Sequence, residues 1–103
     1  MATDSALAFM TAWFVRHCDG DWEHDLGIRI ETLDNPGWAV DVRLGDTELE
    51  GKSAEWHREE ASESEWLHWR STGDTFEARC GPGDLARALA AFQSFAQSAQ
   101  APR

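Results

Sequence analysis

The sequence predicts an α+β fold: a five-stranded antiparallel meander sheet with an N-terminal and a C-terminal helix packed on one face. Apolar residues recur at a spacing of three and four near both ends of the chain, which is typical of helices with one buried side. Between them, five short segments alternate apolar and polar residues and are separated by turn residues, which is typical of antiparallel strands. Because the chain has 103 residues, we expect a single domain over residues 1–103.

The first helix is predicted over residues 4–18, where the apolar residues gather on one side. Its predicted buried face consists of Leu7, Phe9, Met10, Trp13 and Phe14. The sequence Asp-Gly-Asp at 19–21 follows this helix. Gly20 suits the left-handed conformation in which many helices end, so we expect the helix to stop there.

A β-hairpin is predicted next, from two alternating segments at 26–32 and 38–44. The Asp-Asn-Pro-Gly sequence at 34–37 lies between them and is a strong turn signal. Pro36 pre-sets its φ, and Gly37 tolerates a positive φ.

Three further strands are predicted over 54–60, 65–71 and 75–80, joined by short polar turns. The pattern leaves open which face of the first two is buried. Gly81-Pro82-Gly83 then ends the last strand, and Asp84 is a suitable N-cap for a final helix. The apolar stripe of that helix is Leu85, Ala88, Leu89, Phe92, Phe95, Ala96 and Ala99. Residues 97–103 are predicted to be a frayed tail.

The chain is strongly acidic, with 9 Lys and Arg against 19 Asp and Glu, a formal net charge of −10. Such a charge disfavours binding to nucleic acid or to an anionic membrane surface, and a basic protein is its natural complement. Six Trp in so short a chain cannot all be fully buried, so some are expected at the edge of the core or at a partner-binding surface. Two cysteines, no signal peptide and no long apolar run lead us to expect a cytoplasmic protein.

The densest polar cluster, at residues 17–25, contains metal-ligand side chains. It does not fit a calcium loop, since positions six and twelve counted from Asp19 hold His24 and Ile30. A zinc site would lack paired ligand spacing. The simpler interpretation is a solvated loop that Trp22 anchors to the core. We therefore expect no metal, no cofactor and no catalytic residue.

Acidic residues crowd the middle third of the chain, between residues 48 and 65. They predict either a solvated face or an acidic docking surface in which Trp56, Trp66 or Trp69 acts as an apolar anchor. We expect the helix-free face of the sheet to carry this surface.

Several motifs resemble the immunity protein 53 family of bacterial polymorphic toxin systems. They are Trp13-Phe14, CDGDWEH at 18–24, Gly27-Ile28, TLDNPGW at 32–38, Asp46 to Leu49, Trp66 and Gly81-Pro82. Phe14 and Leu26 stand where relatives are expected to have Tyr. The resemblance covers nearly the whole chain.

The resemblance implies a cytoplasmic antidote that binds and neutralises one cognate toxin and is not an enzyme. From the acidity we expect a basic toxin, such as a nuclease, whose active site is blocked. The candidate partner-binding residues are Asp19, Asp21, Trp22, Glu23, His24, Asp34, Trp56, Glu59 and Trp66. The alternatives are a small metal-binding protein or enzyme that uses the 18–24 cluster, and a ligand-binding module with a Trp-lined pocket.

Overall fold

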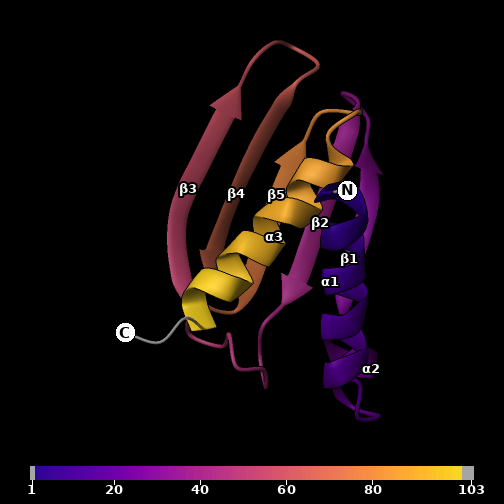
Figure 1. Cartoon of the computed structure of the whole chain (residues 1–103), viewed down its shortest axis with the longest axis vertical. Coiled ribbons are helices and arrows are strands. Elements are labelled where there is room, and N and C mark those ends of the chain that lie inside the picture. Colours follow the sequence, from indigo (N-terminus) through magenta and orange to yellow (C-terminus); the bar gives the residue numbers. More distant parts are fainter. Residues whose placement is uncertain (1, 101–103) are drawn as a thin grey trace.

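The computed structural model describes residues 2–100 and contains three helices and five strands within them (Figure 1). The helices are α1 (Ala2–His17), α2 (Trp22–Asp25) and α3 (Leu85–Gln100). The strands are β1 (Ile28–Leu33), β2 (Gly37–Arg43), β3 (Ser53–Glu60), β4 (Trp66–Thr72) and β5 (Thr75–Cys80). All neighbouring strands are antiparallel. The predicted α+β class, with five antiparallel strands and a helix at each end, is confirmed.

The order of the strands differs from a consecutive meander, because it is β1-β2-β5-β4-β3. β2 pairs with β5, with Val42 opposite Phe76, and β3 lies at the far edge. Burial explains this order. One side of β5, formed by Phe76, Ala78 and Cys80, is fully buried, which suits a central strand, whereas nearly every residue of β3 is exposed. The connection after β2 is pinned by Leu49, whose side chain is also fully buried.

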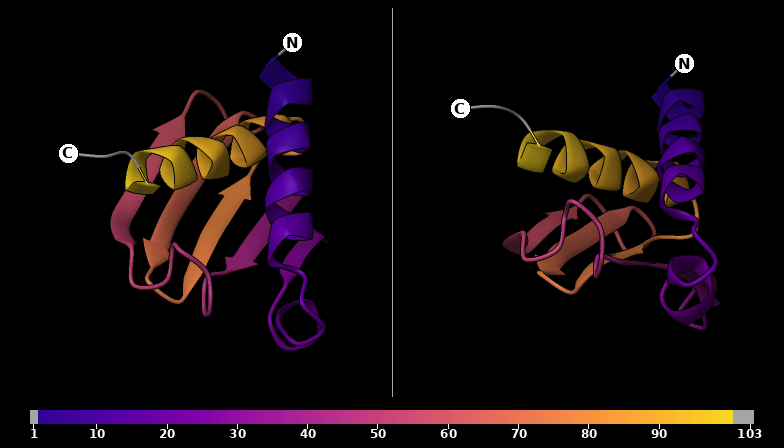
Figure 2. Two further views of the ribbon diagram at one scale, coloured as in Figure 1. Left: turned by 60° about the horizontal axis from the view of Figure 1, so that its bottom comes forward. Right: turned by 90° about the horizontal axis from the view of Figure 1, so that it is seen from below.

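α1 and α3 lie on the same face of the sheet (Figure 2), as the sequence predicts. The core between these layers includes Met10 and Trp13 from α1 and Phe92 from α3. Leu7 is a correction, because it is 55% exposed while its neighbour Ala6 is fully buried. The rest of the predicted face is in place, because Met10 and Trp13 are buried and Phe9 and Phe14 pack against the core.

The register settles which side of β4 is buried. Leu67 and Ser71 face the helices, opposite Cys80 and Phe76 of β5. Trp66, His68 and Arg70 alternate with them and lie on the other face, which no helix covers. We call this second face the open face.

Two glycines illustrate different requirements of the backbone. Gly20 has a φ of 98°, which confirms the predicted left-handed position. Gly37 lies in β2 and has no positive φ, so the predicted reason for this glycine is wrong. An added Cβ at Gly37 would overlap the carbonyl oxygen of Cys80, so close approach of two strands explains the glycine.

α3 continues to Gln100, beyond the point at which the sequence predicts a frayed tail. Residues 101–103, the rest of that tail, lie outside the described residues. Asp84 directly precedes α3, as predicted, but its carboxylate Oδ2 accepts a hydrogen bond from the backbone N–H of Trp66 at 2.9 Å. No helix within residues 2–100 is long and apolar enough to cross a membrane.

Candidate functional site

The loop between α1 and α2 is held by two carboxylates that the sequence predicts as partner contacts. Asp19 Oδ1 accepts hydrogen bonds from the backbone N–H groups of Asp21 and Trp22, both at 2.9 Å. Glu23 in return accepts from the N–H groups of Asp19 and Gly20, at 2.9 and 2.8 Å. Backbone hydrogen bonds, led by that from Trp22, lower the pKa of Asp19, and backbone hydrogen bonds also lower the pKa of Glu23. These two side chains organise the loop and leave Asp21 and His24 exposed beside it.

Trp22 is buried, with 3% of its surface exposed. Its ring lies against Trp13, Phe14 and His17, at centroid distances between 5.6 and 5.8 Å. The side chain therefore offers almost no surface to a partner. Its position agrees with the interpretation of Trp22 as the residue that anchors the loop to the core.

Glu48 is central to this end of the molecule, although the sequence did not single it out. Its carboxylate accepts hydrogen bonds from Trp13 Nε1 and Arg16 Nη2, both at 2.9 Å, and contacts His17 Nε2 at 2.6 Å. Partial burial opposes ionisation, yet hydrogen bonds from its own backbone, His17 and Trp13, together with the charge of His17, lower its pKa to about 2. Glu48 thus ties the β2–β3 loop to the last turns of α1.

Three loops meet at the same end of the molecule, the lower end in Figure 1. They are residues 18–27, 44–52 and 73–74. Gly45 lies against the side chain of Leu26, and the N–H of Gly51 donates to the carbonyl of Gly73 at 2.8 Å. Together these loops carry one lysine, Lys52, and eight exposed acidic residues: Asp19, Asp21, Glu23, Asp25, Asp46, Glu48, Glu50 and Asp74. We call this surface the acidic end.

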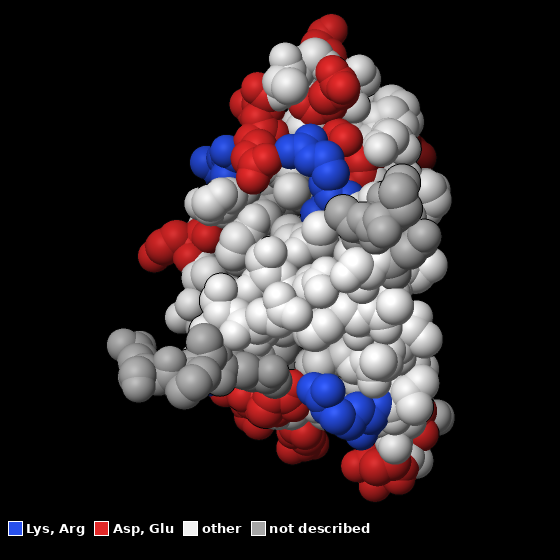
Figure 3. All heavy atoms as spheres, in the orientation of Figure 1, with Lys and Arg blue, Asp and Glu red and all other residues white. Residues whose placement is uncertain are grey.

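The helix-covered face is different in character. Figure 3 shows that charged side chains gather at the two ends of this view and that the surface between them is uncharged. Residues 5–15 of α1 contain no charged residue, and Leu7 and Val15 are 55% and 64% exposed. The exposed surface of α1 between residues 5 and 15 is therefore uncharged and partly apolar.

The open face is not acidic, which corrects the expectation drawn from the sequence. Its strands present five of the nine Lys and Arg residues of the chain: Arg29, Arg43, Arg58, Arg70 and Arg79. Four acidic residues share the face: Glu31, Asp41, Glu60 and Glu77. Arg79 pairs with Asp41 and Arg70 with Glu77, each at 2.9 Å. Alternation along each strand sorted these residues onto one face, so the face is close to neutral.

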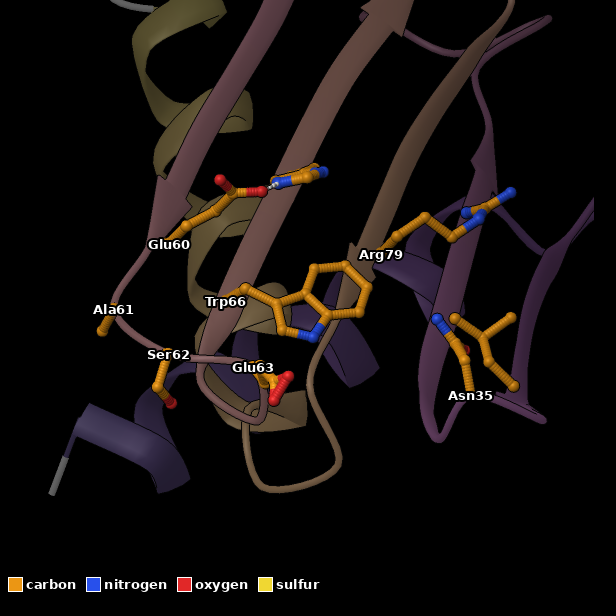
Figure 4. A pocket seen from close by; sticks show the side chains of 9 residues that line it. Asn35, Glu60, Ala61, Ser62, Glu63, Trp66 and Arg79 are labelled. Atoms are coloured by element: carbon orange, nitrogen blue, oxygen red, sulfur yellow. Dashed lines mark hydrogen bonds and ion pairs between the residues drawn. The ribbon is translucent and has the colours of Figure 1, made fainter.

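A groove of about 750 Å³ crosses the open face between the β1–β2 turn and the β3–β4 loop. Figure 4 shows the Trp66 indole in this groove, turned toward the side that Arg79 and Asn35 occupy. His68 Nε2 contacts Glu60 Oε2 at 2.8 Å along one wall. The groove is lined by Leu33, Asn35, Glu60, Ala61, Ser62, Glu63, Trp66, His68 and Arg79. The exposed Asp34 precedes Asn35 in the adjoining turn.

The other predicted contact residues are not gathered in one place. Trp56 is 38% exposed and lies on the open face, with Arg58 and Arg70 over its ring at 5.7 and 4.8 Å. Glu59 projects from the opposite side of β3 and pairs with Arg87 of α3 at 2.6 Å. Residues two apart on a strand share a face, whereas Trp56 and Glu59 are three apart, so Glu59 is separated from both tryptophans of the open face.

Within residues 2–100, no group of three or more His, Cys, Asp and Glu side chains is arranged to hold a metal ion. Cys18 is exposed, and its Sγ donates to the carbonyl of Phe14 at 3.2 Å. Desolvation and the nearby charges of Glu23 and Asp19 raise the pKa of Cys18, which disfavours the thiolate that metal binding or nucleophilic attack requires.

The family model described as Immunity protein 53 matches residues 7–97. Neither the curated proteins nor the solved structures gave a match. The matched segment contains the loop of Asp19 and Glu23, the Asp-Asn-Pro-Gly hairpin, Glu48 and the groove around Trp66. This chain belongs to the Immunity protein 53 family.

Proposed function

We propose that this protein neutralises one cognate toxin by binding it stoichiometrically, without catalysis, and that it acts in the cytoplasm. Membership of an immunity protein family supports a toxin as the partner. The observation that carries the chemistry of the contact is the acidic end, whose three adjoining loops carry eight exposed carboxylates and one lysine. Opposite charge accelerates encounter with a basic protein and disfavours other partners.

The docking surface in this proposal is the open face together with the part of the acidic end that borders it. A second hollow, lined by His24, Asp25, Arg29, Arg43 and Glu77 among others, joins the two. A strand of six or seven residues spans about 20 Å, and a stable interface covers about 800 Å² on each partner. A toxin domain of ordinary size therefore reaches from the acidic end to the groove around Trp66.

A nuclease is the toxin class that this surface favours. Sites that cleave nucleic acid bind phosphates through Lys and Arg, and a row of carboxylates occupies such a site in place of phosphates. The active site is then blocked for as long as the complex lasts. Among the exposed predicted contact residues at this end, Asp19 and Glu23 bind the loop backbone, whereas Asp21 and His24 do not.

Co-expression with the toxin encoded beside this gene tests the proposal. The chain is expected to rescue growth and to form a one-to-one complex whose association slows steeply as salt is raised. The double variant Asp21→Asn/Asp46→Asn removes two charges from the acidic end and is expected to slow association. The control Glu55→Gln/Glu65→Gln removes two charges elsewhere and is expected to have less effect. Lack of rescue together with lack of a complex at low salt would refute the proposal.

A further inference from the structure

We propose that the groove around Trp66 receives an arginine or lysine side chain of the toxin, held between the Trp66 indole and the Glu63 carboxylate. This inference rests on the proposed function and adds a second, specific contact at the opposite end of the open face from the acidic end. It follows from the position of Trp66, from the pairing of the charges around it, and from a comparison with Trp56.

Trp66 is held rigidly at the floor of the groove. Its backbone N–H donates to the buried carboxylate of Asp84 at 2.9 Å, and its carbonyl accepts from the N–H of Gly81 at 3.0 Å. The adjoining loop is closed by backbone hydrogen bonds from Ala61 and Ser62 to the carbonyl of Glu65, at 2.8 and 3.1 Å. A half-buried indole on such a fixed frame loses little conformational entropy when a partner packs against it.

The charges that line the groove leave one carboxylate unpaired. Arg79 is paired with Asp41 at 2.9 Å, and His68 is hydrogen-bonded to Glu60 at 2.8 Å. Glu63 lies at the tip of the β3–β4 loop, is exposed, and its carboxylate has no ion pair or hydrogen bond with any other residue of the described part of the chain. A cation from a partner therefore finds an aromatic face and a free carboxylate in the same groove.

Trp56 shows how arginine side chains pack on an exposed indole of the open face. Arg58 and Arg70 both lie over its ring, and these are the cation–π contacts found within residues 2–100. Within the same residues no Arg or Lys lies over the ring of Trp66, whose one ring neighbour there is His68, tilted by 56° at a centroid distance of 5.2 Å. Because an indole face attracts a guanidinium or an ammonium group, the open cation position over Trp66 is one that a basic toxin can fill.

A short peptide tests the groove without the toxin. Triarginine amide is titrated into ¹⁵N-labelled protein while the six indole N–H signals are followed, and Trp66→Leu identifies the signal of Trp66. The expected result is a saturable shift of that signal, with an affinity about tenfold lower in Glu63→Gln. A peptide with citrulline in place of arginine is expected to cause no shift, because it keeps the shape and loses the charge. Equal shifts with citrulline, or shifts confined to other indoles, would overturn the inference.

The toxin complex provides the second measurement. Trp66→Leu and Glu63→Gln are each expected to weaken the complex about tenfold, whereas the control Leu7→Ala, at an exposed position of α1 on the opposite face of the sheet, is expected to leave it nearly unchanged. Glu63 is an exposed loop residue, so its variant keeps the test valid if Trp66→Leu fails to fold. If both groove variants bind the toxin with unchanged affinity, the inference about the groove is wrong and the proposed function still stands. The failure of any complex to form would overturn both.

Discussion

Trp13 and Glu48 are 35 residues apart in sequence, yet the indole N–H of Trp13 donates to the Glu48 carboxylate at 2.9 Å. This contact fastens the acidic β2–β3 loop to α1. The same carboxylate binds Arg16 and His17, so the attachment of the β2–β3 loop to α1 depends on one side chain. Glu48 is therefore the first place at which the stability of the acidic end can be tested.

Glu48→Gln is expected to lower the free energy of unfolding at neutral pH by about 1 to 2 kcal/mol, after allowance for the screening of a side chain that is one-third exposed. The pKa of Glu48 is about 2, lowered from 4.5. A lowered pKa stabilises the folded state above pH 4.5, and this contribution is lost as the pH falls from 4.5 toward 2. Urea unfolding at pH 7 and pH 3 measures it. The gap between Glu48→Gln and the native chain should narrow at pH 3. A similar loss in the exposed control Glu55→Gln would contradict the prediction.

Trp22→Ala is expected to cost about 3 to 5 kcal/mol, because it empties a packed position against three aromatic rings. Trp56→Ala removes an exposed ring and is expected to cost less than about 1 kcal/mol. Thermal unfolding of the two variants compares them directly. Equal losses of stability would show that the buried ring of Trp22 contributes no more to stability than the exposed ring of Trp56.

Asp19→Ala is expected to loosen the loop before α2 without unfolding the sheet. The variant removes the acceptor of the Asp21 and Trp22 N–H groups, so hydrogen exchange at these two amides should accelerate. Because backbone hydrogen bonds lower the pKa of Asp19 from 3.8, acidification below that value should reduce the protection of the same amides in the native chain, measured relative to the exchange rate of an unfolded peptide at the same pH. Asp21→Ala is the neighbouring control, and it should leave the exchange of the Trp22 amide unchanged.

Gly37→Ala is expected to destabilise the fold by about 2 to 3 kcal/mol, since β2 and β5 must separate to admit a Cβ beside the Cys80 carbonyl. At Gly83 an added Cβ meets no atom within 4 Å. Gly83→Ala should therefore be neutral or slightly stabilising. Chemical denaturation distinguishes the two, and a neutral Gly37→Ala would show that the strands can move apart freely.

The two cysteines are expected to differ in alkylation. Burial, followed by the charge of Asp84, raises the pKa of Cys80 to about 11, and its side chain is fully buried. Iodoacetamide at pH 8 should modify exposed Cys18 slowly in the native chain, because its thiolate is disfavoured, and Cys80 only after unfolding. Mass spectrometry of the modified peptides checks this. Modification of native Cys80 would show that β5 opens readily.

The local sequence pattern determined where the secondary-structure elements lie along the chain. The alternating segments and their turn residues predicted all five strands to within two residues at each end, and β5 was placed at 75–80, where the structure has it. The left-handed Gly20 was also predictable, because the conformation belongs to a single residue. The family followed from motifs that are themselves local, such as the loop of Asp19 and Glu23.

Only the tertiary structure decided which surfaces these elements form. Strand pairing placed β5 beside β2 and collected five arginines on a face that the sequence predicted to be acidic. The crossing from β2 to β3 brought Glu48 to Trp13 and joined three acidic loops at one end. Composition gives the number of charges in a chain, whereas the electrostatic potential at a surface depends on the distances between residues that are far apart in sequence. Those distances are fixed only when the chain folds and buries residues such as Leu49 and Phe76 in the core.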